Sequence, residues 1–156
     1  MLRASLLILL CLSCACGPSP EASLEKAQKA LAGGDYAAAA QSAAQGLAAG
    51  AQGATAWRLE LAGLEAEARS KQASQVLARL TRLAAGPFAA QLGASLYVQT
   101  AGQLKQAGDA GGAIGVLDAG AKRLPQDAEI AKAIEQSKAS GSPEELERLR
   151  SLGYVE

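Results

Sequence analysis

The chain of 156 residues carries 15 Lys and Arg residues against 15 Asp and Glu residues, so its formal net charge is zero. A neutral chain has no electrostatic attraction to a phosphate backbone, which argues against a nucleic-acid-binding protein. The sequence has no histidine, the commonest general base and metal ligand, and it shows no nucleophile elbow, phosphate-binding loop or calcium motif. We therefore expect a protein that is not an enzyme and that holds no metal or cofactor.

Hydrophobic residues make up 49% of the chain, but aromatic residues make up only 3%. Most of the apolar residues are alanines, which favour helices, and no alternating run of useful length predicts a strand. The composition therefore predicts an all-α protein. Because small side chains bury little area each, its helices must pack at close range.

Residues 1–15 are typical of a secretory signal peptide, with Arg3 followed by an apolar run that is too short to span a bilayer. The residues around its end, Leu12-Ser13-Cys14-Ala15-Cys16, resemble a bacterial lipoprotein box. This resemblance implies that Cys16 is lipidated, with Cys14 as the competing position, and an ordinary cleaved signal with chance cysteines is the alternative. Gly17 after the cysteine resembles lipoproteins that are routed to an outer membrane, which implies a cell-envelope protein facing the periplasm.

A short tether over 16–22 is expected to lead into a first helical pair at about 22–33 and 36–49. Leu24, Ala27 and Leu31 form the apolar stripe of its first helix, and Gly33-Gly34 with Asp35 supplies the break. A second pair is expected at about 54–69 and 71–85, with Trp57 in the core between adjacent helices or, as the alternative, exposed on a ligand-facing surface. We then expect the next helix to begin near Pro87, because proline is tolerated at the first position of a helix.

Residues 94–127 show the clearest unit, two helices joined at Gly108-Asp109 and ended by Pro125. Residues 30–48 match residues 103–121 at an offset of 74, with Gly34-Asp35 over Gly108-Asp109. A unit of this kind cannot bury its apolar stripe alone, so neighbours of the same kind are implied.

These residues, together with the positions of Trp57, Tyr36 and Ala73, resemble a degenerate tetratricopeptide repeat (TPR) protein. The resemblance implies a right-handed α-solenoid of about three helix pairs over 23–139. It also implies a partner-binding groove on the first helices of successive units, lined by Leu24, Gln28, Arg58, Ala62, Glu65, Val98, Gly102 and Lys105. Their mixed character argues against a strong carboxylate clamp.

After the third pair, the residues that follow Asp127 are expected to form a capping helix, with a separate short helix and tail over 140–156. Ser142 and Glu145 have the spacing of a capping box, and the helix carries the apolar edge Leu146, Leu149, Leu152 and Tyr154. That edge could dock on the chain itself or on a partner. The ending also resembles the Leu-Gly-Tyr tails of secreted sulfatase-family hydrolases, although no sulfatase active site is present.

Two functions are therefore expected. The first is a non-catalytic adaptor, anchored to the membrane by lipid, that binds a protein or peptide partner in the groove. The alternative is a passive accessory of a secreted sulfatase-type hydrolase system that contacts partners through its C-terminal helix.

Overall fold

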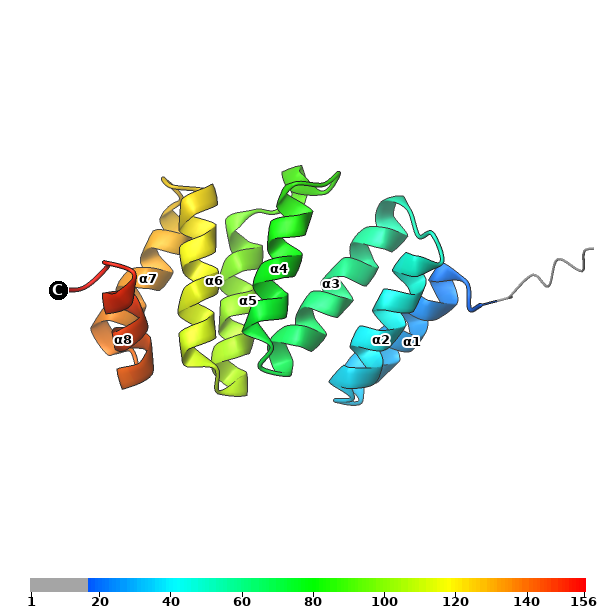
Figure 1. The fold of residues 1–156 in the computed structure, drawn as a ribbon, viewed down its shortest axis with the longest axis horizontal. Helices are drawn as coiled ribbons and strands as arrows, with labels where there is room; N and C mark the ends of the chain where they lie inside the picture. The colour runs from blue at the N-terminus through cyan, green and yellow to red at the C-terminus, as the bar shows by residue number, and fades with distance from the viewer. Residues whose placement is uncertain (1–16) are drawn as a thin grey trace, which may run out of the picture.

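The computed structural model describes residues 17–156, so the predicted signal peptide 1–15 and both candidate lipidation sites, Cys14 and Cys16, lie outside the described residues. Within residues 17–156 every regular element is helical, which confirms the all-α class (Figure 1). The elements are α1 (Pro20–Ala32), α2 (Tyr36–Ala48), α3 (Gly53–Arg69), α4 (Ala73–Ala84), the short 3-10 helix η1 (Ala89–Gln91), α5 (Ala94–Ala107), α6 (Ala110–Arg123), α7 (Ala128–Ser140) and α8 (Pro143–Ser151).

The helices follow one another along the length of the molecule, from α1 and α2 at one end to α7 and α8 at the other (Figure 1). The odd-numbered helices form one row, in which α1 contacts α3, α3 contacts α5 and α5 contacts α7. Among the even-numbered helices, α4 contacts α6 and α6 contacts α8. The last two helices therefore extend both rows, and α8 is more than an appended tail.

The first helix begins earlier than predicted. The Ser19 hydroxyl accepts a hydrogen bond from the Ala22 amide at 3.2 Å, and Pro20 stands at the first helical position. The tether expected over 16–22 is correspondingly shorter. Aspartates cap α2, α6 and α7 in the same way, and α8 has the predicted capping box between Ser142 and Glu145.

The helix expected from Pro87 is wrong, because turns and η1 occupy this segment and α5 begins only at Ala94. Phe88 packs against Trp57 with ring centroids 5.4 Å apart, and Leu92 is buried. The Arg123 guanidinium of α6 donates a hydrogen bond to the Ala89 carbonyl at 2.6 Å. The segment is thus held by two apolar anchors and by a side chain that satisfies a backbone carbonyl, without a continuous helix.

Two clusters of buried apolar side chains meet at α3. The N-terminal cluster is small and comprises Leu24, Ala27, Ala43, Leu59 and Ala62. The main cluster spans α3 to α8 and includes larger side chains such as Tyr97, Leu104, Ile114 and Leu149. Because Leu59 and Ala62 belong to one cluster and Leu64 and Ala68 to the other, α3 joins the two.

Two glycines allow close contacts between helices. A Cβ atom at Gly46 would lie 2.7 Å from Leu59 Cδ1, and one at Gly120 would lie 2.9 Å from Tyr97 Cγ. Larger neighbouring side chains at these two contacts leave no room for a methyl group.

Candidate binding surface

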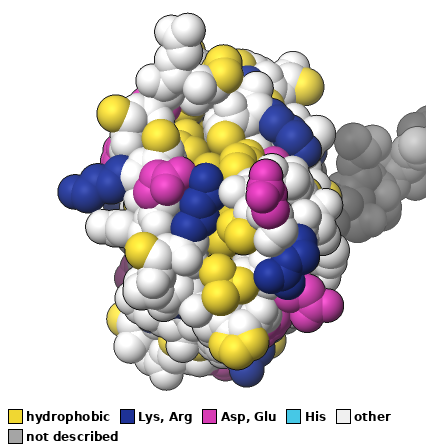
Figure 2. Space-filling model, turned by 90° about the vertical axis from the view of Figure 1, so that its left-hand side faces the viewer, with side chains coloured by type: hydrophobic (Ala, Val, Ile, Leu, Met, Phe, Trp, Pro, Cys, Tyr) yellow, Lys and Arg dark blue, Asp and Glu magenta, His cyan; other side chains and the backbone are white. Residues whose placement is uncertain are grey.

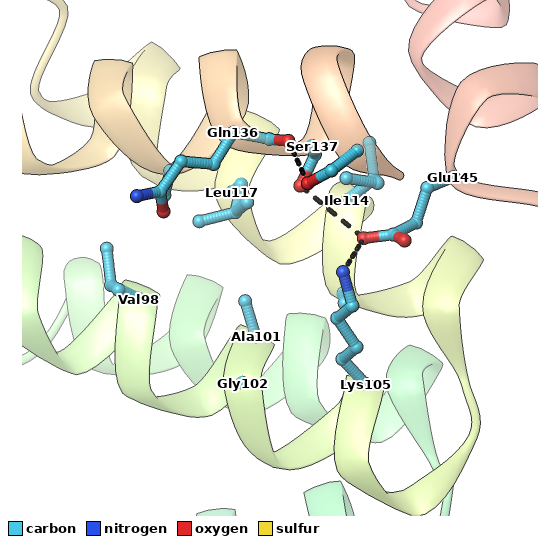
Figure 3. Close-up of a pocket in the computed structure, with 12 residues that line it drawn as sticks. Val98, Ala101, Gly102, Lys105, Ile114, Leu117, Gln136, Ser137 and Glu145 are labelled. Carbon is cyan, nitrogen blue, oxygen red and sulfur yellow. Dashed lines mark hydrogen bonds and ion pairs between the residues drawn. The ribbon is translucent and has the colours of Figure 1, made fainter. Parts of the chain in front are cut away.

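Two hollows along the row of odd-numbered helices are lined by predicted groove residues. The larger one, here the α5–α7 hollow, has a volume of about 390 Å³ and is lined by Val98, Ala101, Gly102, Lys105, Ala113, Ile114, Leu117, Ala133, Gln136, Ser137, Ser140 and Glu145 (Figure 3). The other, the α1–α3 hollow, has a volume of about 340 Å³ and is lined by Gln28, Leu31, Arg58, Leu61, Ala62 and Glu65.

The structure places seven of the eight predicted groove residues in these two hollows. Val98, Gly102 and Lys105 line the α5–α7 hollow, whereas Gln28, Arg58, Ala62 and Glu65 line the α1–α3 hollow. Leu24 lines neither hollow. Its side chain is only 6% exposed and belongs to the N-terminal cluster, so its assignment to the groove is corrected.

The floor of the α5–α7 hollow is apolar and its mouth is open. Ile114 and Leu117 of α6 reach up between α5 and α7 and are almost fully buried (Figure 3). Gly102 lies on the α5 side, and a Cβ atom there would meet nothing within 4 Å. The missing side chain therefore leaves space for an apolar group of a ligand.

One end of this hollow is closed by an ion pair. The Lys105 ammonium of α5 lies 2.8 Å from Glu145 Oε1 of α8, and the Ser137 hydroxyl of α7 donates to the same oxygen at 3.4 Å (Figure 3). The other carboxylate oxygen accepts from the Ser142 amide at 2.8 Å. Glu145 thus ties α8 to both α5 and α7.

The protonation of Glu145 follows from these contacts. Burial of the carboxyl acts to raise its pKa, but the hydrogen bond from Lys105 and those at Ser142 outweigh burial and lower the pKa below its usual value. The carboxylate is charged at neutral pH and its charge is balanced by Lys105. The predicted groove cation Lys105 is therefore already paired.

Sequence reasoning missed the contribution of α7 and α8 to the site. Gln136, Ser137 and Ser140 come from the helix expected to be a cap, and Glu145 comes from the expected tail. A signal was present, since α7 begins 34 residues after α5, at Ala128 and Ala94. That offset equals the unit length read from residues 94–127, and it marks α7 as the first helix of a further pair.

The α1–α3 hollow is lined by one arginine and one glutamate, Arg58 and Glu65. Arg58 is exposed and has no ion-pair partner among residues 17–156, while Glu65 pairs with Arg69 at 2.8 Å. One positive charge in this hollow is therefore not matched by a carboxylate of the described chain. An anionic group of a ligand can take that place.

A separate ionic cluster joins α3 to α4. The Arg79 guanidinium donates to Glu67 at 2.6 and 2.9 Å and also contacts Glu60, which accepts from Arg82 at 2.9 Å. Gly63 makes room for the guanidinium, because a Cβ atom there would lie 2.8 Å from Arg79 Cζ. Hydrogen bonding to the carboxylates raises the pKa of Arg79 even though burial opposes this. The cluster contains two positive and two negative charges, so it is neutral as a whole. We interpret it as a contact that holds α3 against α4.

The C-terminal tail docks on its own chain. Leu149 is fully buried, the Tyr154 hydroxyl donates to Asp118 of α6 at 3.1 Å, and the Lys138 ammonium lies 5.9 Å from the centre of the Tyr154 ring. Figure 2 shows apolar side chains in a hollow on this end of the molecule, with charged side chains beside them. Of the two alternatives for the apolar edge of α8, the structure has the intramolecular one.

Within residues 17–156 no group of His, Cys, Asp and Glu side chains is placed to hold a metal ion. None of the described helices is both long and apolar enough to cross a membrane. Comparison with models of protein families, with curated proteins and with solved structures gives no match to this chain. The arrangement that can be assigned from the residues themselves is a pair of hollows on one row of helices, one apolar and one with an unmatched positive charge.

Proposed function

We propose that this chain is a TPR-like lipoprotein of the bacterial cell envelope that binds a segment of a partner protein across its odd-numbered helices, without catalysis. The observation that carries the proposal is the α5–α7 hollow, which has an apolar floor and a polar rim of neutral amide and hydroxyl groups. Sites for ligands commonly combine these two features at this size.

The helix contacts support a repeat architecture. Each odd-numbered helix contacts the next one along its row, and α2 and α6 each pack against the preceding helix. A right-handed solenoid of helix pairs accounts for this pattern and for the offset of 74 residues between the Gly-Asp turns. Solenoids of this kind use the surface along one row of elements for binding.

The chemistry of the hollow supports binding over catalysis. Its two charged groups, Lys105 and Glu145, neutralise each other, and the chain offers no histidine as a general base. The remaining polar side chains are amides and hydroxyls, and the carboxylate that accepts from the Ser137 hydroxyl, Glu145, is already paired with Lys105. These groups can donate and accept hydrogen bonds with a peptide backbone.

The membrane anchor is proposed from the sequence around Cys16. Replacing Cys16 by alanine should remove an acyl modification from the mature chain, measured by intact mass spectrometry, whereas Cys14→Ala should leave it in place. The opposite pattern would assign the modification to Cys14, and no acyl mass in the unsubstituted chain would end the lipoprotein part of the proposal.

Site-specific photocrosslinking tests the binding part. A benzophenone amino acid at position 102 points into open space and should crosslink to another polypeptide in cells that express the full chain. The matched control carries the same group at Gln41, which is exposed on α2 outside both hollows. Equal crosslinking from both positions, or none from position 102, would contradict partner binding at the α5–α7 hollow.

A further inference from the structure

We infer that the partner segment carries an uncharged aliphatic side chain that fills the α5–α7 hollow and an acidic side chain that binds Arg58 in the α1–α3 hollow. This inference rests on the proposed function and specifies which chemistry the binding surface selects. It follows from how the charges of the two hollows are already matched within the chain.

The α5–α7 hollow excludes a charged group. Lys105 is paired with Glu145 at 2.8 Å, so neither a carboxylate nor an ammonium of a ligand finds an unmatched counter-charge there. Insertion of either group would place an unpaired charge beside Ile114 and Leu117, which is costly in an apolar site. An aliphatic side chain gains burial against the same two residues and against Val98.

The rim of the hollow suits a peptide backbone next to that anchor. The exposed Gln136 side chain offers both a donor and an acceptor, and Ser140 lies one turn further along α7. Figure 3 shows Gln136 on the α7 side of the hollow, opposite Val98 and Gly102 of α5. A segment that lies between these helices can therefore bury a side chain while its amides bind α7.

The α1–α3 hollow selects the opposite chemistry. Arg58 has no carboxylate partner within residues 17–156, while the acidic residue in this hollow, Glu65, is matched by Arg69. A carboxylate of the ligand can therefore form a bidentate contact with the Arg58 guanidinium without displacing an existing pair. A basic ligand side chain would be repelled.

The row of helices sets the spacing between the two contacts. Packed helices lie about 8–10 Å apart, and the two hollows are separated by two such steps, so about 16–20 Å lies between them. An extended chain advances about 3.3 Å per residue. The aliphatic and acidic residues of the ligand are therefore expected about five or six positions apart.

A positional-scanning array of synthetic decapeptides, probed with the full chain in detergent, tests this inference. We expect the strongest signals for Leu, Ile, Val or Met at one position and for Asp or Glu about five or six positions away. Gly102→Trp should reduce binding at least about tenfold by filling the hollow. The control Gln41→Trp places the same side chain on the exposed surface of α2 and should leave binding unchanged.

Reversal of the charge at Arg58 separates the two contacts. Arg58→Glu should switch the preference at the acidic position to Lys or Arg and leave the aliphatic preference in place. A different result would be that the array selects peptides with a charged or aromatic anchor and that Gly102→Trp still abolishes their binding. That result would overturn this inference and leave the proposed function standing. No peptide binding, together with no crosslinking from position 102, would overturn both.

Discussion

The two ends of the molecule pack in different ways. The pair α1–α2 is joined to α3 by the N-terminal cluster, in which three of the five buried residues are alanine. The helices from α3 to α8 share the main cluster, in which only four of the seventeen buried residues are alanine and the others are leucine, isoleucine, valine and tyrosine. Since buried area scales with side-chain size, the N-terminal pair should be the less stable region.

The largest loss of stability is expected from breaking the ionic cluster between α3 and α4, which lies next to the junction of the two regions. Arg79→Ala leaves Glu60 and Glu67 buried, at 4% and 6% exposure, without their main partner. We expect a loss of about 3–5 kcal/mol in the free energy of unfolding, measured by urea denaturation. Lys122→Ala breaks an exposed pair with Asp118 and should cost below about 1 kcal/mol. Equal losses would show that burial does not set the strength of these contacts.

A cavity in the main cluster and a cavity in the N-terminal cluster should speed hydrogen exchange in different sets of helices. Leu104→Ala in the main cluster should cost about 2–5 kcal/mol and speed hydrogen exchange from α3 to α8, because Leu104 is fully buried. Leu24→Ala should cost less and speed exchange mainly in α1 and α2. If Leu24→Ala accelerates exchange equally in α5–α8, the two regions unfold as one unit and the contrast between them is lost.

Glu145 gives the stability of the C-terminal region a dependence on pH. Its folded-state pKa lies below the ordinary value of 4.5, so its stabilising contribution is complete above that value and is lost as the pH falls through the folded-state pKa. Glu145→Gln should cost about 1–2 kcal/mol at pH 7.

That cost should shrink as the pH falls below the ordinary carboxyl value, which paired urea titrations of the two proteins would measure. Glu147→Gln alters an exposed neighbour on α8 and serves as the control. A cost for Glu145→Gln that stays constant down to pH 3 would mean that the carboxylate charge is not what holds α8.

The smallest effect concerns the turn between α3 and α4. In the first and third pairs a glycine adopts the left-handed conformation and an aspartate caps the next helix, as at Gly108 and Asp109. In the middle pair Lys71 takes that conformation, with φ of 59°, and Gln72 makes no capping bond. Gln72→Asp should therefore stabilise the protein by about 0.5–1 kcal/mol in thermal unfolding. A loss of stability would argue against capping as the difference between the turns.

Local signals in the sequence were sufficient to predict most of the helices. The Gly-Asp turns, the capping box at Ser142 and the apolar stripes all correspond to structure, because each acts within a few residues. The segment after Pro87 was misread because its conformation depends on Trp57 and Arg123, which are distant in sequence. No local pattern reports such contacts.

The sequence predicted several positions of the candidate site but not the contacts between helices that shape it, for a similar reason. Positions on α3 and α5 followed from the resemblance, but Leu24 faces the core. Lys105 is paired with Glu145 on α8, which also accepts a hydrogen bond from Ser137 on α7. The spacing of Glu60 and Glu67 around Gly63 gave no indication that Arg79 fits between them. Ion pairs between helices depend on how the two rows of helices pack against each other. The periodicity of residues along one helix carries no information about that packing.

Hydrogen exchange of the full chain, alone and with the strongest peptide from the array, tests the central claim most directly. Binding across the odd-numbered helices should slow exchange in α3, α5 and α7 and leave α2 and α4 unchanged. Protection confined to the even-numbered helices, with none in α5 or α7, would contradict the proposed binding surface.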